Sequence, residues 1–134
     1  MNTKMNFHHI GIVCRSIDVE IEEYKLFGYE LEGVVFEDPL QCVRGVFMTL
    51  GGMRIELLEP LGIDSPINSV IRRKIKIYHQ CFECSQFEEA LKTLVNNGCV
   101  VAKEPTRTVA FNLRRVVFLM TPNNALVELL ETST

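Results

Sequence analysis

The chain has 134 residues, 47% of them hydrophobic, and a formal net charge of -3 at pH 7. This length suits one domain or two small fused halves, and the nearly balanced charge argues against nucleic acid as a partner. The sequence has no apolar run near the roughly 20 residues of a membrane helix and no secretory signal at its start. We therefore expect a cytoplasmic protein that binds neither nucleic acid nor membranes.

The first half of the chain is predicted to form a strand, a helix and three more strands. "FHHIGIVC" is a short apolar strand, and Ser16 or Asp18 is a suitable cap for the helix that follows. Gly28 is placed to end this helix in a left-handed conformation. The last two strands are joined by "GG" as a hairpin. The five expected elements cover residues 7–14, 16–28, 29–37, 43–50 and 53–59.

The second half repeats this plan after a linker. A short helix near 66–73 is expected within the linker, because Pro66 suits the first turn of a helix. Ser85 is the expected cap and Gly98 the expected end of the next long helix, and Pro105 is expected to end the strand after it. The two hairpins are similar as letters, "RGVFMTLGGMRIELLE" and "RRVVFLMTPNNALVELLE". The elements of the second half cover residues 76–84, 85–98, 99–104, 114–120 and 125–131.

This repeat predicts an α+β fold built from two tandem βαβββ modules. Module one covers residues 6–60, the linker 61–75 and module two 76–131, within a single domain over residues 1–134. Cys81 and Cys84 form a C-x-x-C pair, but side chains three apart on a strand point to opposite faces. The five cysteines, an odd number, are therefore expected to be reduced core residues rather than a zinc or redox site.

Two histidines and two glutamates recur at matching positions of the repeat. His9 precedes Glu56 by 47 residues, and His79 precedes Glu128 by 49. A lone histidine on an apolar strand is usually a satisfied core residue, but four such residues at duplicated positions favour a metal site. Two imidazoles and two carboxylates suit one divalent ion such as Zn, Ni, Co or Mn. His8 is expected to point outward and is given no role.

This ligand set predicts a class of chemistry. Four protein ligands on an ion that accepts six leave two adjacent positions for substrate oxygens. An ion that holds a carbonyl oxygen stabilises the enolate formed when the neighbouring C–H bond loses its proton. Glu128 or Glu56 is then the candidate catalytic base that takes or returns the proton. We therefore expect a metal-dependent isomerase or lyase.

At these residues the sequence resembles the vicinal oxygen chelate superfamily of glyoxalases, bleomycin-resistance proteins and dioxygenases. "HHIGIV", "IELLEP", "YHQCFE" and "LVELLE" are similar to the segments that carry the metal ligands of the family. The resemblance implies an open, cup-shaped barrel with one divalent ion per site, held by His9, Glu56, His79 and Glu128. An open cup leaves strand edges for a second subunit, and family members are commonly dimers, so a homodimer is expected. Whether the site lies within one chain or across two stays open.

Within the superfamily, "LLEPLGIDSPI" and "EDPLQCV" resemble the methylmalonyl-CoA epimerase branch and its glyoxalase-like relatives. This implies a small-molecule substrate, a CoA or other thiol ester or adduct, with Gln41, Arg114 and Arg115 as candidate substrate-binding residues. One departure is that Gly45 falls at or beside the acid/base glutamate of the bacterial epimerases. Two alternatives remain. One is an enzyme of the lactoylglutathione lyase (glyoxalase I) type, because the resemblance implies the same His-Glu-His-Glu ligand set. The other is a non-catalytic module that binds a small molecule, which Gly45 fits.

Overall fold

The computed structural model describes residues 4–132, and their contacts divide into two units. The first unit is His9–Tyr78, and the second joins the residues before His9 to those after Tyr78. This division cuts across β1 (Met5–Val13), whereas the predicted module boundaries follow the repeated elements. Within residues 4–132, no helix is long and apolar enough to cross a membrane.

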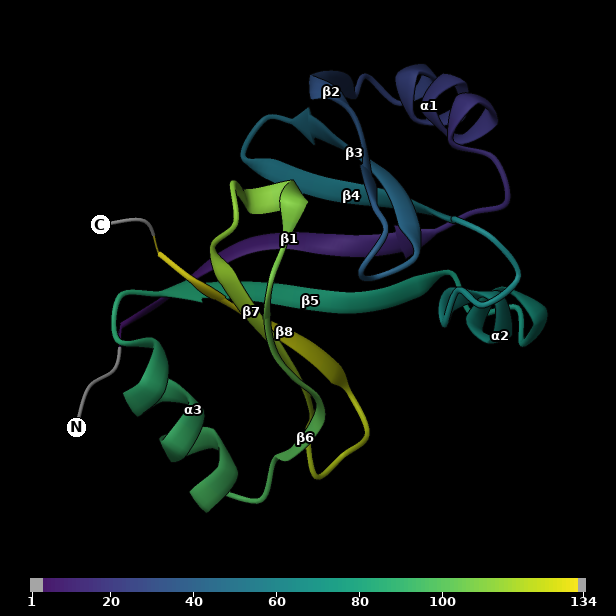
Figure 1. The fold of residues 1–134 in the computed structure, drawn as a ribbon. Coiled ribbons are helices and arrows are strands. Elements are labelled where there is room, and N and C mark those ends of the chain that lie inside the picture. Colours follow the sequence, from purple (N-terminus) through teal and green to yellow (C-terminus); the bar gives the residue numbers. More distant parts are fainter. Residues whose placement is uncertain (1–3, 133–134) are drawn as a thin grey trace. The chain divides into compact units, whose positions relative to one another are not determined.

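The first unit contains a four-stranded sheet in the order β2-β3-β4-β1. Strand β1 runs parallel to β4, with Ile10 opposite Ile55, and the other neighbours are antiparallel. Helix α1 packs on one face of this sheet (Figure 1). Besides the end of β1, the elements of this unit are α1 (Ile17–Leu26), β2 (Glu30–Asp38), β3 (Val43–Leu50), β4 (Met53–Pro60) and α2 (Ile67–Arg72).

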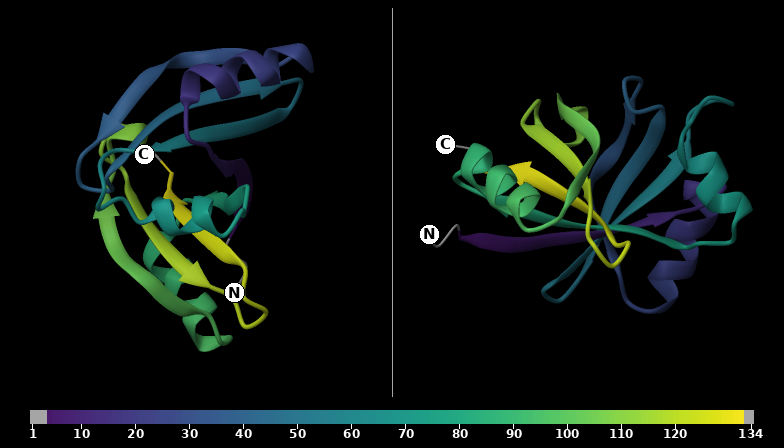
Figure 2. Two further views of the ribbon diagram at one scale, coloured as in Figure 1. Left: turned by 90° about the vertical axis from the view of Figure 1, so that its right-hand side faces the viewer. Right: turned by 90° about the horizontal axis from the view of Figure 1, so that it is seen from below.

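The second unit has the same arrangement, with strand order β5-β8-β7-β6 and β5 parallel to β8. Helix α3 lies along β8, as the two further views in Figure 2 also show. Its elements are β5 (Ile77–Cys84), α3 (Phe87–Asn96), β6 (Val100–Arg107), the 3-10 turn η1 (Val109–Phe111), β7 (Arg115–Met120) and β8 (Leu126–Glu131). The predicted α+β class with two βαβββ modules is therefore confirmed.

The start of β1 packs with the second unit. The Phe7 and Phe82 rings meet edge to face with centroids 5.8 Å apart, and Met5 packs against the buried cluster under α3. These contacts tie the first residues of β1 to the second unit, although Met5 is only partly buried and Phe7 remains 44% exposed.

Helix α1 begins and ends where the sequence predicts. The Ser16 hydroxyl accepts a hydrogen bond from the Val19 N–H at 3.4 Å. The Glu59 carboxylate accepts a second one from the Ile17 N–H at 2.8 Å. These bonds satisfy two of the backbone donors that a helix leaves open at its start. Gly28, with φ of +99°, follows the last turn.

Two details of the second unit differ from the prediction. Helix α3 starts at Phe87 with Gln86 at the cap position, and no side chain caps it, so the Ser85 cap is wrong. Instead Phe87 is buried under the sheet, and this packing sets the start of the helix. Strand β6 also runs through Pro105, because its pairing with β7 is irregular there and needs no donor from proline.

Side chains alternate between the two faces of each sheet, so that core residues and the two predicted glutamate ligands lie on opposite faces. Ile55 and Leu57 of β4 pack under α1, so Glu56 between them faces the other side of the sheet. Leu129 of β8 packs under α3, and Glu128 beside it likewise points away from the helix. Each unit therefore presents its acidic residue on the face that its long helix does not cover.

Candidate functional site

The first unit holds a buried histidine–glutamate pair. Gly11 of β1 lies directly across from Glu56 of β4, and His9 precedes Gly11 by two residues on the same face. The His9 Nε2 atom is 3.1 Å from the Glu56 Oε1 atom. The two residues are only 0% and 4% exposed, so the pair is withdrawn from bulk water.

The second unit holds the equivalent pair with the same geometry. Cys81 of β5 lies directly across from Glu128 of β8, as Gly11 does from Glu56. The His79 Nε2 atom is 3.1 Å from the Glu128 Oε1 atom, and both residues are buried. The parallel pairing of the first and last strand of each βαβββ module thus produces both pairs.

A phenylalanine supports each histidine ring in the same way. Phe47 lies across from Glu56 in the β3–β4 ladder, and its ring meets the His9 ring edge to face, with centroids 5.4 Å apart. Phe118 lies across from Glu128 in the β7–β8 ladder and meets His79 edge to face, also at 5.4 Å. These contacts fix the orientation of each imidazole and keep water from one of its sides.

The donor set of each pair fits a divalent metal ion. Metal bonds of about 2.0–2.2 Å to imidazole nitrogen and carboxylate oxygen place adjacent ligand atoms roughly 3 Å apart. The 3.1 Å separation within each pair matches this spacing. A buried carboxylate also requires a positive partner or strong donors, which a cation supplies. Each pair can therefore contribute one nitrogen and one oxygen ligand without moving.

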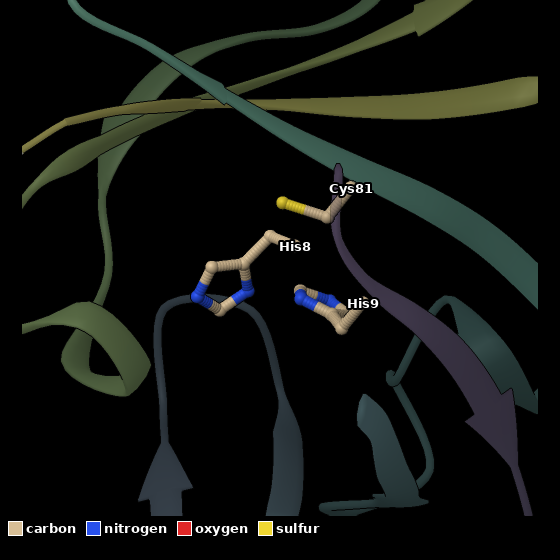
Figure 3. A group of neighbouring side chains, drawn as sticks. All are labelled: His8, His9 and Cys81. Atoms are coloured by element: carbon tan, nitrogen blue, oxygen red, sulfur yellow. The ribbon is translucent and has the colours of Figure 1, made fainter. Parts of the chain in front are cut away.

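His8 does not point outward as the alternation predicts. Its side chain is half-buried, and its ring meets the Phe111 ring edge to face, with centroids 5.3 Å apart. A ring nitrogen of His8 lies within 4.8 Å of the Cys81 Sγ atom, and Figure 3 shows both side chains. The cause is local to the second unit, where the η1 turn covers this part of β1.

The prediction that the five cysteines are core residues holds for Cys14, Cys81 and Cys84, which are buried, whereas Cys42 and Cys99 are only partly buried. All five are free thiols. Cys81 and Cys84 are both buried, and Cys84 belongs to the apolar cluster under α3, on the face opposite to Cys81. Burial raises the pKa of the Cys84 thiol, which disfavours the thiolate that metal binding and redox chemistry require.

An aromatic ring covers Gly45 on the open face of the first unit. Phe36 of β2 lies directly across from Gly45 of β3. A methyl group built on Gly45 would come within 3.0 Å of several atoms of the Phe36 ring. The position where the resemblance leads one to look for an acid/base glutamate is therefore closed to any side chain while Phe36 keeps this rotamer.

The two candidate arginines lie on different faces of the second unit. Arg115 binds Glu131 at 2.9 Å and Glu88 at 2.6 Å, and its guanidinium stacks 4.7 Å from the Phe87 ring centre, beside α3. Arg114 lies 3.6 Å from Glu83, which shares a face of β5 with His79. Of the two, only Arg114 is on the side that carries His79 and Glu128.

Gln41 lies in the turn between β2 and β3. Its backbone N–H and its side-chain amide both donate to the Asp38 carboxylate, at 3.2 and 3.4 Å. These bonds hold the turn together, and they use one of the amide donors that a substrate would otherwise receive.

Arg54 is a residue of this face that the sequence reasoning missed. It precedes Glu56 by two residues on β4 and therefore shares its face. Its guanidinium binds the Glu32 carboxylate through two hydrogen bonds, at 2.7 and 3.1 Å. The period of two along "MRIELLE" was the signal that could have found it.

A sequence profile of the glyoxalase/bleomycin resistance protein/dioxygenase superfamily matches residues 8–118. The match covers most of the chain and includes three of the four paired residues, His9, Glu56 and His79. The chain belongs to this superfamily. The resemblance read from the sequence is thereby confirmed.

Among its relatives, the chain is 31% identical over 129 residues to the mitochondrial methylmalonyl-CoA epimerase of Dictyostelium discoideum, covering 92% of this chain and 76% of that one. A hypothetical protein of Bacillus halodurans has the same fold, with a TM-score of 0.86, 29% identity and coverage of 98% and 96%. A methylmalonyl-CoA epimerase solved with methylmalonyl-CoA and ammonium superposes with a TM-score of 0.81, 25% identity and coverage of 97% and 96%. The solved structures confirm the expected fold over almost the whole chain.

We predict that Gly45→Ala destabilises the protein because the new methyl group collides with the Phe36 ring. Overpacking of this kind costs about 1–3 kcal/mol. In a Phe36→Ala background the same change should be neutral or stabilising, since alanine is favoured over glycine in an open strand. Urea unfolding of the two single variants and the double variant measures this coupling. Gly52→Ala, with open space around its Cβ position, is the control. Equal costs of Gly45→Ala in both backgrounds would contradict the packing.

We also predict that Glu131 stabilises the fold in a pH-dependent way. The hydrogen bond from Arg115 lowers the pKa of Glu131 below its usual value of 4.5. A carboxyl group with a lowered pKa stabilises the folded state above its usual pKa, and this contribution is lost as the pH falls through the lowered value. Glu131→Gln should lower the free energy of unfolding by about 0.2–1 kcal/mol at pH 7.

Urea unfolding from pH 7 to pH 3 measures this difference, which should shrink as the solution becomes more acidic. Glu104→Gln, which changes an exposed glutamate on β6, is the control and should leave the stability unchanged at every pH. A difference between Glu131→Gln and the wild type that stays constant across this range would contradict the assignment to the Arg115–Glu131 pair.

Proposed function

We propose that His9, Glu56, His79 and Glu128 bind one divalent metal ion, Zn, Ni, Co or Mn, and that the protein is an enzyme that transfers a proton next to a carbonyl or thioester group. The observation that carries this proposal is the equality of the two buried pairs, each with Nε2 and Oε1 3.1 Å apart. The repeat thus supplies the same buried nitrogen and oxygen donors, beside a phenylalanine, in both modules.

The residues have separate tasks in this proposal. The imidazoles of His9 and His79 bind as neutral donors through Nε2, in the orientation that Phe47 and Phe118 set. A divalent ion acts as a Lewis acid toward a substrate oxygen and stabilises the negative charge that develops when the α-proton leaves. The carboxylate of Glu128 or Glu56 takes that proton and returns it. A second proton donor comes from water or from another residue.

The relatives suggest the class of substrate. The Dictyostelium relative is named as a methylmalonyl-CoA epimerase, and a solved structure of similar fold binds methylmalonyl-CoA. In that molecule the reacting C–H bond lies between a thioester and a carboxylate, and the thioester carbonyl acidifies its proton. We therefore propose a CoA or other thiol ester or adduct as substrate, with Arg114 as its candidate anion contact. A homodimer and a cytoplasmic location stay predictions.

The glycine at position 45 is compatible with two other functions, neither of which requires an acid/base carboxylate at this position. Because the Phe36 ring covers Gly45, no carboxylate stands there to serve as the second acid/base of an epimerase. An enzyme of the lactoylglutathione lyase type needs only one base, which shuttles the proton on one side of the substrate. A non-catalytic module that binds a small molecule needs none.

The test is exchange of the α-proton with D2O, measured by mass spectrometry, on methylmalonyl-CoA and on the methylglyoxal–glutathione adduct. We expect exchange with at least one of them, its loss after dialysis against a chelator, and its return with Zn, Ni, Co or Mn. Glu128→Gln should lower the exchange rate by about 10²- to 10⁴-fold in protein shown to retain its metal, if Glu128 rather than Glu56 is the proton carrier.

Glu131→Gln is the matched control, because Glu131 lies on the same strand but faces Arg115 beside α3. It should leave the exchange rate unchanged. Exchange with the glutathione adduct alone would support the lyase type. Binding of a thioester without exchange, in metal-loaded protein, would support the non-catalytic module and contradict the enzyme.

A further inference from the structure

An apolar surface adjoins the histidine–glutamate pair of the first unit. The ring of Phe47 meets the His9 ring at 5.4 Å, and the ring of Phe36 continues from it, with centroids 6.0 Å apart and planes inclined by 31°. Both phenylalanines are half-buried, so part of each ring remains open to a ligand. Phe36 and Phe47 are called the aromatic wall below.

Pairing of the strands fixes where the aromatic wall stands. Phe47 is directly across from Glu56, and Phe36 is directly across from Gly45, one row further along the same face of the sheet. Because Gly45 has no side chain, the Phe36 ring packs directly against the backbone of Gly45. The aromatic wall therefore begins beside the His9–Glu56 pair and continues from Phe47 to Phe36 as one apolar surface.

The charged groups of this face lie elsewhere. Glu32 is held by Arg54 through two hydrogen bonds, and Asp38 accepts two from Gln41. Within residues 9–78, the part of the face between these two groups offers Glu56 and His9 as its polar atoms, followed by the two rings. If a ligand were held through its oxygen atoms beside His9 and Glu56, its neighbouring atoms would contact the phenylalanine rings.

We propose that the aromatic wall binds an apolar alkyl substituent on the reacting carbon, and so selects substrates by the length of that substituent. This inference rests on the proposed function, which places the reacting carbon beside the metal ligands. Transfer of each methylene group from water onto the rings is favourable by the hydrophobic effect, so affinity rises with chain length. Phe36 and Phe47 are thus specificity-determining residues, and Gly45 is the position that lets Phe36 adopt its place.

The test uses 2-methyl-, 2-ethyl- and 2-butylmalonyl-CoA with zinc-loaded protein. Calorimetric titration gives the dissociation constant of each, and exchange of the α-proton in D2O is followed in the same samples. For the wild type we expect affinity to rise about two- to four-fold per methylene. In Phe36→Ala this gradient should flatten, and in Phe36→Leu, which keeps an apolar side chain, it should persist.

Phe82→Ala is the matched control, because Phe82 is also half-buried but packs against Phe7 in the second unit. It should keep the wild-type gradient. Circular dichroism and zinc content confirm that each variant is folded and loaded before titration. These controls separate a loss of the aromatic wall from a loss of the fold.

The outcomes distinguish this inference from the proposed function. Exchange without any gradient in the wild type, or the same gradient in Phe36→Ala as in the wild type, would overturn the aromatic wall and leave the proposed function standing. A gradient that Phe36→Ala removes, without exchange of any thioester or adduct, would support the wall and contradict the enzyme. Absence of both gradient and exchange would overturn both.

Discussion

The burial of an imidazole against a carboxylate is the constraint on which each unit of this protein depends. A buried carboxylate is costly unless it has a partner, and the cost is largest where water cannot reach it. His9 with Glu56, and His79 with Glu128, are buried at the same 3.1 Å separation. The parallel pairing of β1 with β4, and of β5 with β8, places each histidine two residues before the position opposite its glutamate. Helices α1 and α3 pack on the other faces and leave these faces available for binding.

Most of this framework can be predicted from the sequence, because the same pattern of strands, helix and charged residues occurs in both halves of the chain. Similar hairpin letters identify the βαβββ modules, and the similar offsets from histidine to glutamate, 47 and 49 residues, identify the two pairs from the sequence alone. The pairing of His9 with Glu56 follows from the strand order of such a module. The roles of the four residues as metal ligands remain a prediction that the family resemblance supports.

The failures of prediction have physical causes. Ser85 is a good cap by composition, but burial of Phe87 moves the start of α3 beyond it. His8 follows the alternation of a strand, yet the η1 turn brings Phe111 over it. The contact of Phe36 with Gly45 depends on an irregularity in β2, where two extra residues separate Glu32 from Phe36 relative to the facing strand. Such a bulge changes the register, and Gly33, which lies within it with φ of +77°, is its signal in the sequence.

The central claim is that two equal pairs serve one ion, and X-ray absorption at the metal edge, combined with metal content per chain, tests it most directly. We predict one ion per chain, bound by two imidazoles and by oxygen at about 2.0–2.2 Å. His9→Ala and His79→Ala should each weaken the binding of that same ion, whereas His8→Ala should not. Two ions per chain, one lost with each variant, would contradict a shared site. A sulfur ligand at about 2.3 Å would instead assign the ion to Cys81 and contradict the account.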